Sequence, residues 1–242
     1  MELVIRNVLA AILLLSLTGC EPNVESCSPV LKDATRLVLV TTRSMDDTRA
    51  TLRTFERSTG DEAWVASSEP EPAVVGARGL AWGHPFVSRA KSGEPEKREG
   101  DKRTPAGIYV FGATFGFDDA KRDGHLRLVA GEHYCVNDVR SPHYGRIVPK
   151  SVAGMGTSGE EMAAIDVYKR GIVIDYPPER QAKGGSCIFL HIWEGEGIGT
   201  LGCVALPEAR VAHLQDWARA ERTAIAILPE AALSRFKGCL PQ

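Results

Sequence analysis

The sequence predicts a mainly β fold of the α+β class, with mixed β-sheets and few helices. The 242 residues include 24 glycines and 14 prolines, which favour many turns between short elements. Short apolar runs rich in β-branched residues recur along the chain, as is typical of strands. Helical periodicity is rare, and its clearest example, residues 207–222, lies near the C-terminus.

The first half is expected to hold one buried strand followed by shorter antiparallel strands. Residues 36–42 (RLVLVTT) are apolar and β-branched, which predicts the buried strand. Segments 50–58, 62–66 and 72–75 are short and separated by glycine, proline or charged residues, a pattern typical of antiparallel strands. Residues 88–103 are rich in charges of both signs, so we expect a solvated loop to which charge alone assigns no function.

The second half is expected to add more strands and a single long helix. Residues 104–111 follow a proline turn and then become apolar, which predicts a strand. Residues 171–176 and 186–193 are the strongest strand candidates, because both are apolar runs bounded by glycine or proline. The helix over residues 207–222 begins with proline, which fits a first helical turn, and residues 224–228 predict a closing strand.

The N-terminus has the features of a lipoprotein signal peptide. Arg6 precedes an apolar run at residues 8–17, which is too short to span a bilayer but suits a signal-peptide core. Residues 17–20 (LTGC) resemble the bacterial lipobox, which implies that Cys20 becomes a diacylated first residue. In such lipoproteins Glu21, not being aspartate, implies the outer membrane. The alternative is an ordinary secretory signal with a chance cysteine.

The expected organisation is a signal peptide over residues 1–19, a lipidated tether over 20–34 and one domain over 35–242. No internal repeat or break in composition divides that domain. The net charge of −2 and the pI near 6.3 give no sign of a nucleic-acid partner. We therefore expect a periplasmic protein attached to a membrane through Cys20, with the outer membrane favoured.

The six cysteines suit an exported protein, because disulfides persist in oxidising compartments. Setting aside Cys20 as the lipidation candidate and Cys203 as a possible nucleophile leaves four, which allow three pairings. Of these we favour Cys27–Cys239, which would tie the two ends together, and Cys135–Cys187. The spacings match no zinc-binding CxxC arrangement, and no histidine pattern predicts a metal site, so no metal or other cofactor is expected.

Residues 191–203 (HIWEGEGIGTLGC) carry the chemistry. A cysteine becomes a strong nucleophile as its thiolate, and His191 can act as the base if the glycine-rich loop folds it against Cys203. Gly202 permits a tight turn and would leave backbone N–H groups free to face a developing oxyanion. An activated Cys203 would be alkylated well below the ordinary thiol pKa of about 8.5. Residue types alone favour the alternative of a buried structural cysteine and a satisfied core histidine.

The segment from residue 186 to residue 206 resembles the YkuD family of L,D-transpeptidases, whose signature is a histidine, a loop and then Ser/Thr-x-Gly-Cys. Further similarity extends over roughly residues 74–228. Residues 100–109 (GDKRTPAGIY) are similar to a Gly-Asp-Gly-x-Thr-Pro-x-Gly segment of the family. The signature and the segments similar to one branch of the family place these residues in register: His191, Thr200, Gly202, Cys203, Val136, Asn137, Asp138, Ser141, Tyr144, Ile147, Val148, Tyr168, Val173, Ile174 and Tyr176.

The chain departs from the common family pattern beside the nucleophile. Many members carry a histidine immediately before the Gly-Cys pair, where this chain has Leu201, and Asn or Arg two residues after the cysteine, where it has Ala205. The loop between His191 and Cys203 is also shorter than in many relatives. Because the replaced groups are thought to help hold the substrate, these changes put donor recognition in doubt and indicate a subfamily.

The resemblance implies a YkuD-like catalytic domain that acts on peptidoglycan stem peptides through a thioester on Cys203. His191 would be the base and Gly202 part of the catalytic turn, with Thr200, Tyr144 and Asn137 binding substrate. An amine that resolves the thioester makes the protein a transpeptidase, whereas water makes it an L,D-carboxypeptidase or amidase. A third possibility is a non-catalytic lipoprotein that binds peptidoglycan. The oligomeric state and the acceptor are not indicated by the sequence.

Overall fold

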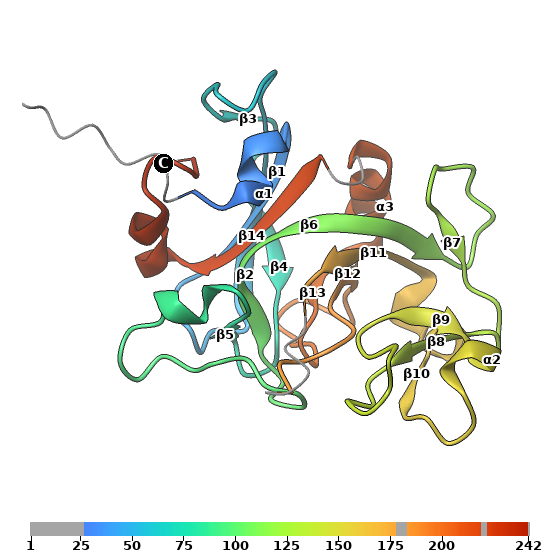
Figure 1. Ribbon diagram of the computed structural model, residues 1–242. Helices are drawn as coiled ribbons and strands as arrows, with labels where there is room; N and C mark the ends of the chain where they lie inside the picture. The colour runs from blue at the N-terminus through green and yellow to red at the C-terminus, as the bar shows by residue number, and fades with distance from the viewer. Residues whose placement is uncertain (1–26, 178–182, 219–221, 242) are drawn as a thin grey trace, which may run out of the picture.

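A computed structural model describes residues 27–177, 183–218 and 222–241, and it is mainly β with few helices, as predicted. A large sheet forms most of the molecule, and its strands run in the order β1-β14-β6-β11-β12-β13-β4-β2-β3 (Figure 1). Because β1 also pairs with β2, this sheet closes on itself. Two short strands pair with β6. The strands are β1 Arg36–Thr42, β2 Arg49–Glu56, β3 Val65–Ala66, β4 Glu71–Val74, β5 Leu80–Trp82, β6 Thr104–Gly116, β7 Leu126–Arg127, β11 Arg170–Asp175, β12 Phe189–Ile192, β13 Val204–Leu206 and β14 Thr223–Pro229.

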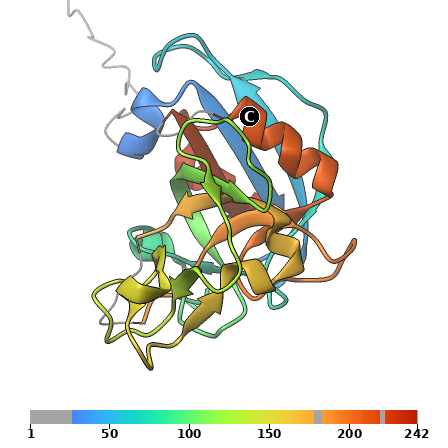
Figure 2. The ribbon, with the colours of Figure 1, turned by 90° about the vertical axis from the view of Figure 1, so that its right-hand side faces the viewer.

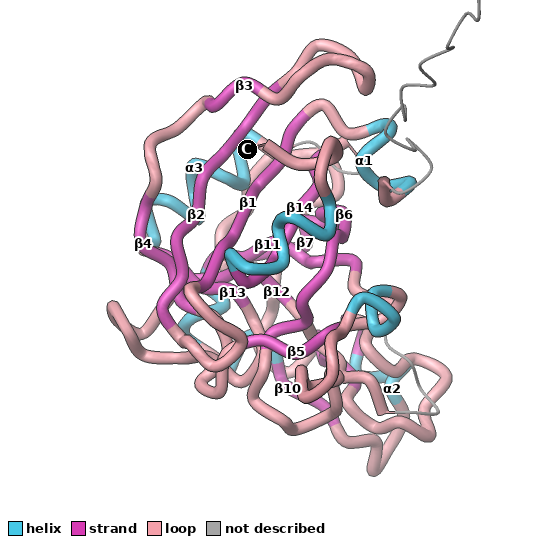
Figure 3. The backbone as a smooth tube through the Cα atoms, turned by 90° about the vertical axis from the view of Figure 1, so that its left-hand side faces the viewer, coloured by secondary structure: helices cyan, strands magenta, loops and turns pink. Residues whose placement is uncertain are grey.

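Two of the predicted strands, residues 36–42 and 224–228, correspond to the neighbouring strands β1 and β14 of this sheet. β1 coincides with the predicted segment 36–42, and it runs parallel to β14 with Val38 opposite Ile225. Figure 3 shows β2, β1, β14 and β6 side by side. The whole of β14 is buried, which explains why both β1 and β14 are continuous apolar runs rather than alternating ones.

A second, three-stranded sheet lies beside the β12–β13 end of the large sheet (Figure 1). It consists of β10 Gly159–Glu161, β8 His133–Val136 and β9 Ile147–Pro149, in that order, with the short helix α2 Lys150–Ala153 at its edge. Sequence patterns did not predict these strands as elements, because each is only three or four residues long.

Helices are few and short. The helix α3 covers Glu208–Trp217 and packs its buried face, Val211 and Leu214, on the large sheet (Figure 2). It ends earlier than the predicted residue 222, because Ala218 is already extended. The remaining helices are α1 Pro29–Asp33 and the 3-10 helices η2 Phe86–Arg89, η3 Met162–Ala164, η4 Asp166–Lys169 and η5 Glu230–Phe236.

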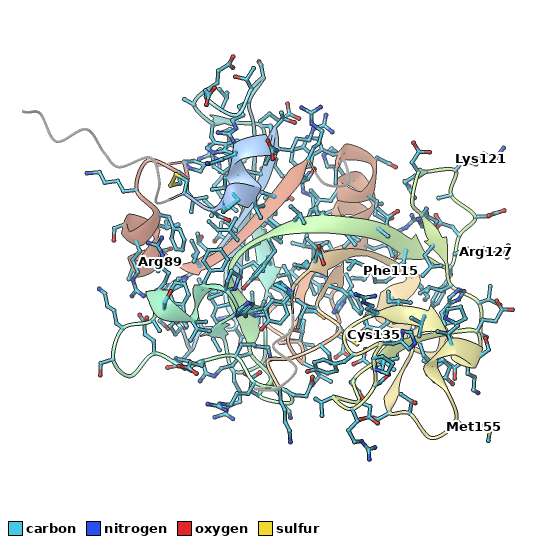
Figure 4. The ribbon with its side chains drawn as sticks, viewed as in Figure 1. Arg89, Phe115, Lys121, Arg127, Cys135 and Met155 are labelled. Atoms are coloured by element: carbon cyan, nitrogen blue, oxygen red, sulfur yellow. A yellow bond between two sulfur atoms is a disulfide. The ribbon has the colours of Figure 1, made fainter. Side chains whose placement is uncertain are left out.

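Two disulfides match the predicted pairings. Cys27 bonds to Cys239 and so joins the two ends of the described chain, and Cys135 bonds to Cys187. Figure 4 labels Cys135 inside the lobe formed by the small sheet, with Met155 at its outer edge. Cys203 is the free cysteine of the described residues.

The N-terminal end of the described chain is packed on the domain. Within the segment expected to be a tether, Leu31 and Ala34 are buried in the main core, beside the Cys27 disulfide. Cys20 and the signal peptide lie outside the described residues, so lipidation stays a prediction. Among the described residues no helix is long and apolar enough to cross a membrane.

Two apolar clusters fill the interior. The main core lies within the large closed sheet and includes Leu37, Leu52, Ile108 and Phe111. A smaller cluster lies between the large sheet and the small sheet, and we call it the site cluster. It consists of Phe115, Leu128, Cys135, Met162, Tyr168, Cys187, Phe189 and Cys203. The candidate nucleophile is therefore itself part of an apolar core.

Candidate active site

Neighbouring parallel strands position the two candidate catalytic residues. His191 lies on β12 and pairs with Ala205 on β13, and Cys203 immediately precedes β13. The loop between them turns back along β12, so both side chains line one cleft of about 710 Å³. The predicted approach of His191 and Cys203 across the glycine-rich loop agrees with this arrangement.

The turn before Cys203 is held by Thr200. The Thr200 hydroxyl donates a hydrogen bond of 2.7 Å to the Cys203 carbonyl and accepts one of 3.1 Å from the Gly202 N–H. Gly202 has a φ of +150°, and a Cβ there would lie 3.2 Å from the Arg103 carbonyl, so glycine suits both the backbone and the space. The Gly202 N–H is thus engaged by Thr200, and the Thr200 hydroxyl is used within the turn, so an oxyanion would have to be met by other backbone N–H groups of this turn.

The start of β6 anchors the nucleophile from the other side. Thr104 donates a hydrogen bond of 2.9 Å to the Cys203 carbonyl and accepts one of 2.8 Å from the Gly76 N–H. The same carbonyl therefore receives two hydroxyl donors, from Thr104 and Thr200. The Thr-Pro motif of residues 104–105 thereby acquires a physical role, because it fixes the backbone of Cys203.

The Cys203 thiol is buried, with an exposed fraction of 6% for the residue. Its sulfur accepts a hydrogen bond from the Phe189 N–H at 3.3 Å and donates one to the Cys187 carbonyl at 3.4 Å. Burial, followed by the nearby Glu160 carboxylate, raises the pKa of the thiol to about 12, although the Phe189 N–H and the Lys97 cation act the other way. This upward shift runs against the expectation of alkylation well below a pH of about 8.5, which stays a prediction for the alkylation experiment.

His191 is a neutral base over most of the pH range. Its Nδ1 lies 2.7 Å from the Ile192 carbonyl, which can only accept, so Nδ1 carries the proton and Nε2 holds the free lone pair. Burial lowers the pKa of the imidazole to about 4, and this hydrogen bond opposes the shift. Between about pH 4 and pH 12, the His191 imidazole and the Cys203 thiol are therefore both uncharged, and the two residues do not form an ion pair.

Aromatic side chains hold the histidine ring. The Tyr168 ring meets the His191 ring edge-on at 5.3 Å and packs on Phe115 and Phe189 at 5.8 and 5.5 Å. Gly171 pairs with His191 across the β11–β12 ladder and lies under the Phe115 ring. A Cβ at Gly171 would lie 2.2 Å from that ring, so a glycine is required beneath it.

A carboxylate lies behind this aromatic group. The Tyr168 hydroxyl donates a hydrogen bond of 2.9 Å to Glu160 on β10, which places a charged group of the small sheet next to the site. Burial raises the pKa of Glu160, and the hydrogen bond from Tyr168 opposes that shift. The Glu160 charge in turn disfavours the thiolate of Cys203.

The structure brings together five of the six predicted site residues. Cys203, His191, Gly202, Thr200 and Asn137 all line the cleft. Asn137 contributes from the small sheet side, where its side-chain oxygen accepts a hydrogen bond from Ser158.

Tyr144, predicted to bind substrate, is not among the residues that line the cleft. It is 4% exposed, and its hydroxyl donates a short hydrogen bond to Glu99. Burial, together with that carboxylate, raises the pKa of the phenol. Because Glu99 itself lines the cleft and also accepts a hydrogen bond of 2.8 Å from Ser186, the structure gives Tyr144 the role of a support for Glu99.

Sequence reasoning missed the charged groups of the cleft. Lys97, Glu99 and Lys102 come from the loop that was expected to be merely solvated, and Glu160 lies in no recognised motif. For Lys97, Glu99 and Lys102, the one sequence feature that could have indicated a place in the cleft is their position close to the Thr104 motif. No group of three or more potential metal ligands occurs among the described residues.

A second hollow, of about 550 Å³, lies beside Arg43, Arg49 and Gly197. Its lining contains no cysteine or histidine, so the predicted cysteine–histidine chemistry is not available there. The cleft at Cys203 is therefore the candidate active site.

The solved structures to which the chain is similar include Bd1075 from Bdellovibrio bacteriovorus, at 18% identity and a TM-score of 0.41, over 87% of this chain and 56% of that one. The helical cell shape determining protein Pgp2 from Campylobacter jejuni is similar at 16% identity and a TM-score of 0.41, over 81% of this chain and 48% of that one. The chain thus spans about half the length of these proteins. No protein-family model and no curated protein matches the sequence.

Proposed function

We propose that this chain is a cysteine-dependent L,D-transpeptidase that acts on peptidoglycan stem peptides. The observation that carries the proposal is that the free Cys203 thiol and the neutral His191 line the same cleft of about 710 Å³. A cleft of that size suits a short peptide. The substrate class follows from the resemblance of residues 186–206 and 100–109 to the YkuD family.

The first half-reaction forms a thioester. His191 Nε2 takes the proton from Cys203 Sγ as the sulfur attacks the carbonyl of the L-centre residue, expected to be the diamino acid of the stem. The bond between that carbonyl and the terminal D-residue breaks, and the imidazolium returns its proton to the leaving amine. The neutral form of His191 is the one that can accept this proton. Because the pKa of the thiol lies far above that of the imidazole, the proton must move as the sulfur attacks rather than before it.

The second half-reaction releases the acyl group. An amine from a neighbouring stem attacks the thioester, loses a proton to His191 and forms the new amide, and Cys203 regains its proton. Water in place of the amine would yield a free carboxylate, which is the outcome of an L,D-carboxypeptidase. The nucleophile, the base and the first half-reaction are the same in both cases.

The proposed setting is the periplasm, with the chain anchored by lipid on Cys20, preferably at the outer membrane. The disulfides Cys27–Cys239 and Cys135–Cys187 support export, because such bonds are rare in proteins of the reducing cytosol. The partners are then peptidoglycan stem peptides and the membrane.

The test is mass spectrometry of purified muropeptides incubated with the full chain and with Cys203→Ala. We expect cross-linked or amine-exchanged products from the wild type and a loss of at least about a thousandfold in the variant. Shortened stems from the wild type alone would instead make the protein a hydrolase. Equal products from both proteins, across several stem types, would contradict the enzyme proposal and favour a peptidoglycan-binding protein. A matched melting curve checks that Cys203→Ala is folded.

A further inference from the structure

Lys97 is a buried cation in the wall of the candidate active site. It lies in the loop of residues 88–103, which the sequence led us to expect as solvated, yet its side chain is only 3% exposed. It lines the same cleft as Cys203. A lysine at such a depth is uncommon in proteins unless its charge is paired.

A tight turn holds the Lys97 ammonium in place. Its Nζ donates hydrogen bonds of 2.6 Å to the Asp101 carboxylate and 2.7 Å to the Arg98 carbonyl. The Asp101 carboxylate also accepts the backbone N–H groups of Arg98 and Arg103, at 2.7 and 2.9 Å. Asp101 is therefore fixed by the backbone of the turn, and it fixes the lysine in turn.

The far side of Lys97 is covered by the segment that leads into β12. A Cβ at Gly185 would lie 2.9 Å from Lys97 Cε and 3.0 Å from Nζ, so the chain passes directly over the ammonium. Two residues further on, the Cys187 carbonyl accepts the hydrogen bond from the Cys203 thiol. The covering segment thus connects the lysine to the nucleophile.

The turn that holds Lys97 is also joined to the backbone of the nucleophile. Its last residue, Arg103, has its carbonyl 3.2 Å from the position of a Cβ on Gly202. The next residue, Thr104, donates its hydrogen bond to the Cys203 carbonyl. Lys97 and Cys203 are therefore held at a fixed separation by short, hydrogen-bonded connections on two sides.

Opposite charges act on the thiol from two walls of the cleft. Glu160, on the small sheet, disfavours the thiolate, whereas Lys97 favours it. The Lys97 charge is partly balanced by Asp101, so the strength of that ion pair determines how much positive potential reaches the sulfur. The titratable groups that line the cleft with Cys203 are Lys97, Glu99, Lys102, Glu160, Tyr168, His191 and Glu194.

We propose that Lys97 is a positioning residue for the reaction, whose buried ammonium acts through Cys203 by stabilising the developing thiolate, with Asp101 setting the strength of the effect. This inference deepens the proposed function and rests on it for its biological meaning. Replacing a buried ion pair by apolar residues is often neutral for stability. Stability alone therefore does not explain a buried Lys97–Asp101 pair, whereas an electrostatic effect on Cys203 does.

The test measures alkylation of Cys203 by iodoacetamide in the oxidised full chain, followed by mass spectrometry of the peptide that contains Cys203. At a pH well below the thiol pKa, the rate is proportional to the thiolate fraction, so rates between pH 8 and pH 10 compare variants directly. Asp101→Asn should react faster than the wild type, because it leaves the Lys97 charge unbalanced. Lys97→Met/Asp101→Asn should react about tenfold more slowly than Asp101→Asn, which corresponds to one pKa unit.

The double variant removes both charges, so neither is left buried without its partner. Asp101→Asn leaves the ammonium without its carboxylate, so its rate is compared under conditions in which its melting curve shows folded protein. Lys91→Met is the matched control, because Lys91 is an exposed lysine of the same loop, and its alkylation rate should equal that of the wild type. Equal rates for Asp101→Asn and the double variant, with both proteins folded by their melting curves, would overturn the inference.

This result is independent of the muropeptide assay. A Lys97-dependent alkylation rate in a protein without muropeptide activity would support the electrostatic role and contradict the proposed function. The opposite result is also informative. If muropeptide products depend on Cys203 but the alkylation rate does not depend on Lys97, the proposed function is supported and the inference about Lys97 is overturned.

Discussion

The main core and the site cluster differ in size and in the groups that they enclose, although each contains a disulfide and edge-on aromatic pairs. The main core buries aliphatic strand residues such as Leu37 and Ile225, and Cys27–Cys239 joins the chain ends at its edge. The site cluster is smaller and surrounds the Cys203 thiol with aromatic rings and the Cys135–Cys187 disulfide. The first arrangement stabilises the fold, whereas the second fixes the surroundings of the free Cys203 thiol.

Buried tyrosines show the same contrast. In the main core, the Tyr109 and Tyr176 hydroxyls donate to the carbonyls of Ala106 and Gly184, so both are satisfied by neutral backbone groups. In the site cluster, the Tyr168 hydroxyl donates to the Glu160 carboxylate, which itself acts on the thiol. Polar groups in the main core complete the fold, and those in the site cluster also set the charge around Cys203.

The largest expected effects come from removing each disulfide in turn. The paired residues are 212 positions apart for Cys27–Cys239 and 52 for Cys135–Cys187. A chain-entropy argument then gives losses in the free energy of unfolding of about 5 and about 4 kcal/mol for the two double serine variants. Denaturant unfolding of oxidised protein measures both losses.

Activity should separate the two disulfide variants where stability does not. Cys135→Ser/Cys187→Ser releases the segment whose carbonyl binds the Cys203 thiol, so muropeptide turnover by the folded protein should fall about tenfold or more. Cys27→Ser/Cys239→Ser is remote from the cleft and should keep turnover within about twofold once corrected for the folded fraction. Equal activity losses in both variants would refute the division between a structural and a functional disulfide.

The sequence predicted the main core better than the site cluster. Continuous apolar runs such as residues 36–42 and 224–228 determine their own burial, so β1 and β14 were found at nearly their observed bounds. The pairing of Cys27 with Cys239 agreed as well. The strands depend on local hydrophobicity, which is readable from one sequence. Cysteine counting left three pairings open, and the favoured one, with both Cys27–Cys239 and Cys135–Cys187, is the one that the structure has.

The site residues that belong to one compact motif were predictable from the sequence, whereas those from distant segments were not. His191, Thr200, Gly202 and Cys203 lie within thirteen residues, and they do share a cleft. Lys97 and Glu160 come from distant segments, and only tertiary packing brings their charges to the thiol. The shift of the thiol pKa to about 12 has the same origin, because burial in the site cluster depends on strands that no periodicity revealed.

A pH-dependent stability difference should identify the buried His191, whose ring packs on Tyr168 of the site cluster. The folded-state pKa of His191 is about 4, below the ordinary value of 6.5, so its contribution is complete above pH 6.5 and is lost as pH falls toward 4. This loss amounts to about 3 kcal/mol at most. His191→Gln should lack that part of the acid destabilisation, as measured by denaturant unfolding at pH 7 and pH 4.

His213→Gln is the matched control for this experiment, because His213 is exposed on α3. It should retain the acid destabilisation of the wild type. If His191→Gln and His213→Gln lose stability equally between pH 7 and pH 4, the imidazole of His191 is not held neutral by burial, and the general-base route would lose its support.

The smallest effect distinguishes two glycines on the paired strands β6 and β11. A Cβ at Gly171 would lie 2.2 Å from the Phe115 ring, whereas a Cβ at Gly112 would meet Val173 at an ordinary 3.4 Å. Gly171→Ala should cost about 1–3 kcal/mol through overpacking. Gly112→Ala should be neutral or stabilise by about 0.5 kcal/mol, because alanine loses less backbone entropy than glycine.

Muropeptide turnover should respond to the same pair of variants. A displaced Phe115 moves against Tyr168, whose ring packs on His191, so Gly171→Ala should lower turnover at least tenfold in folded protein. Gly112→Ala leaves those rings in place and should retain wild-type turnover. A Gly171→Ala protein that is destabilised yet fully active would show that the aromatic rings support the fold alone, and that the position of His191 is set by its own strand.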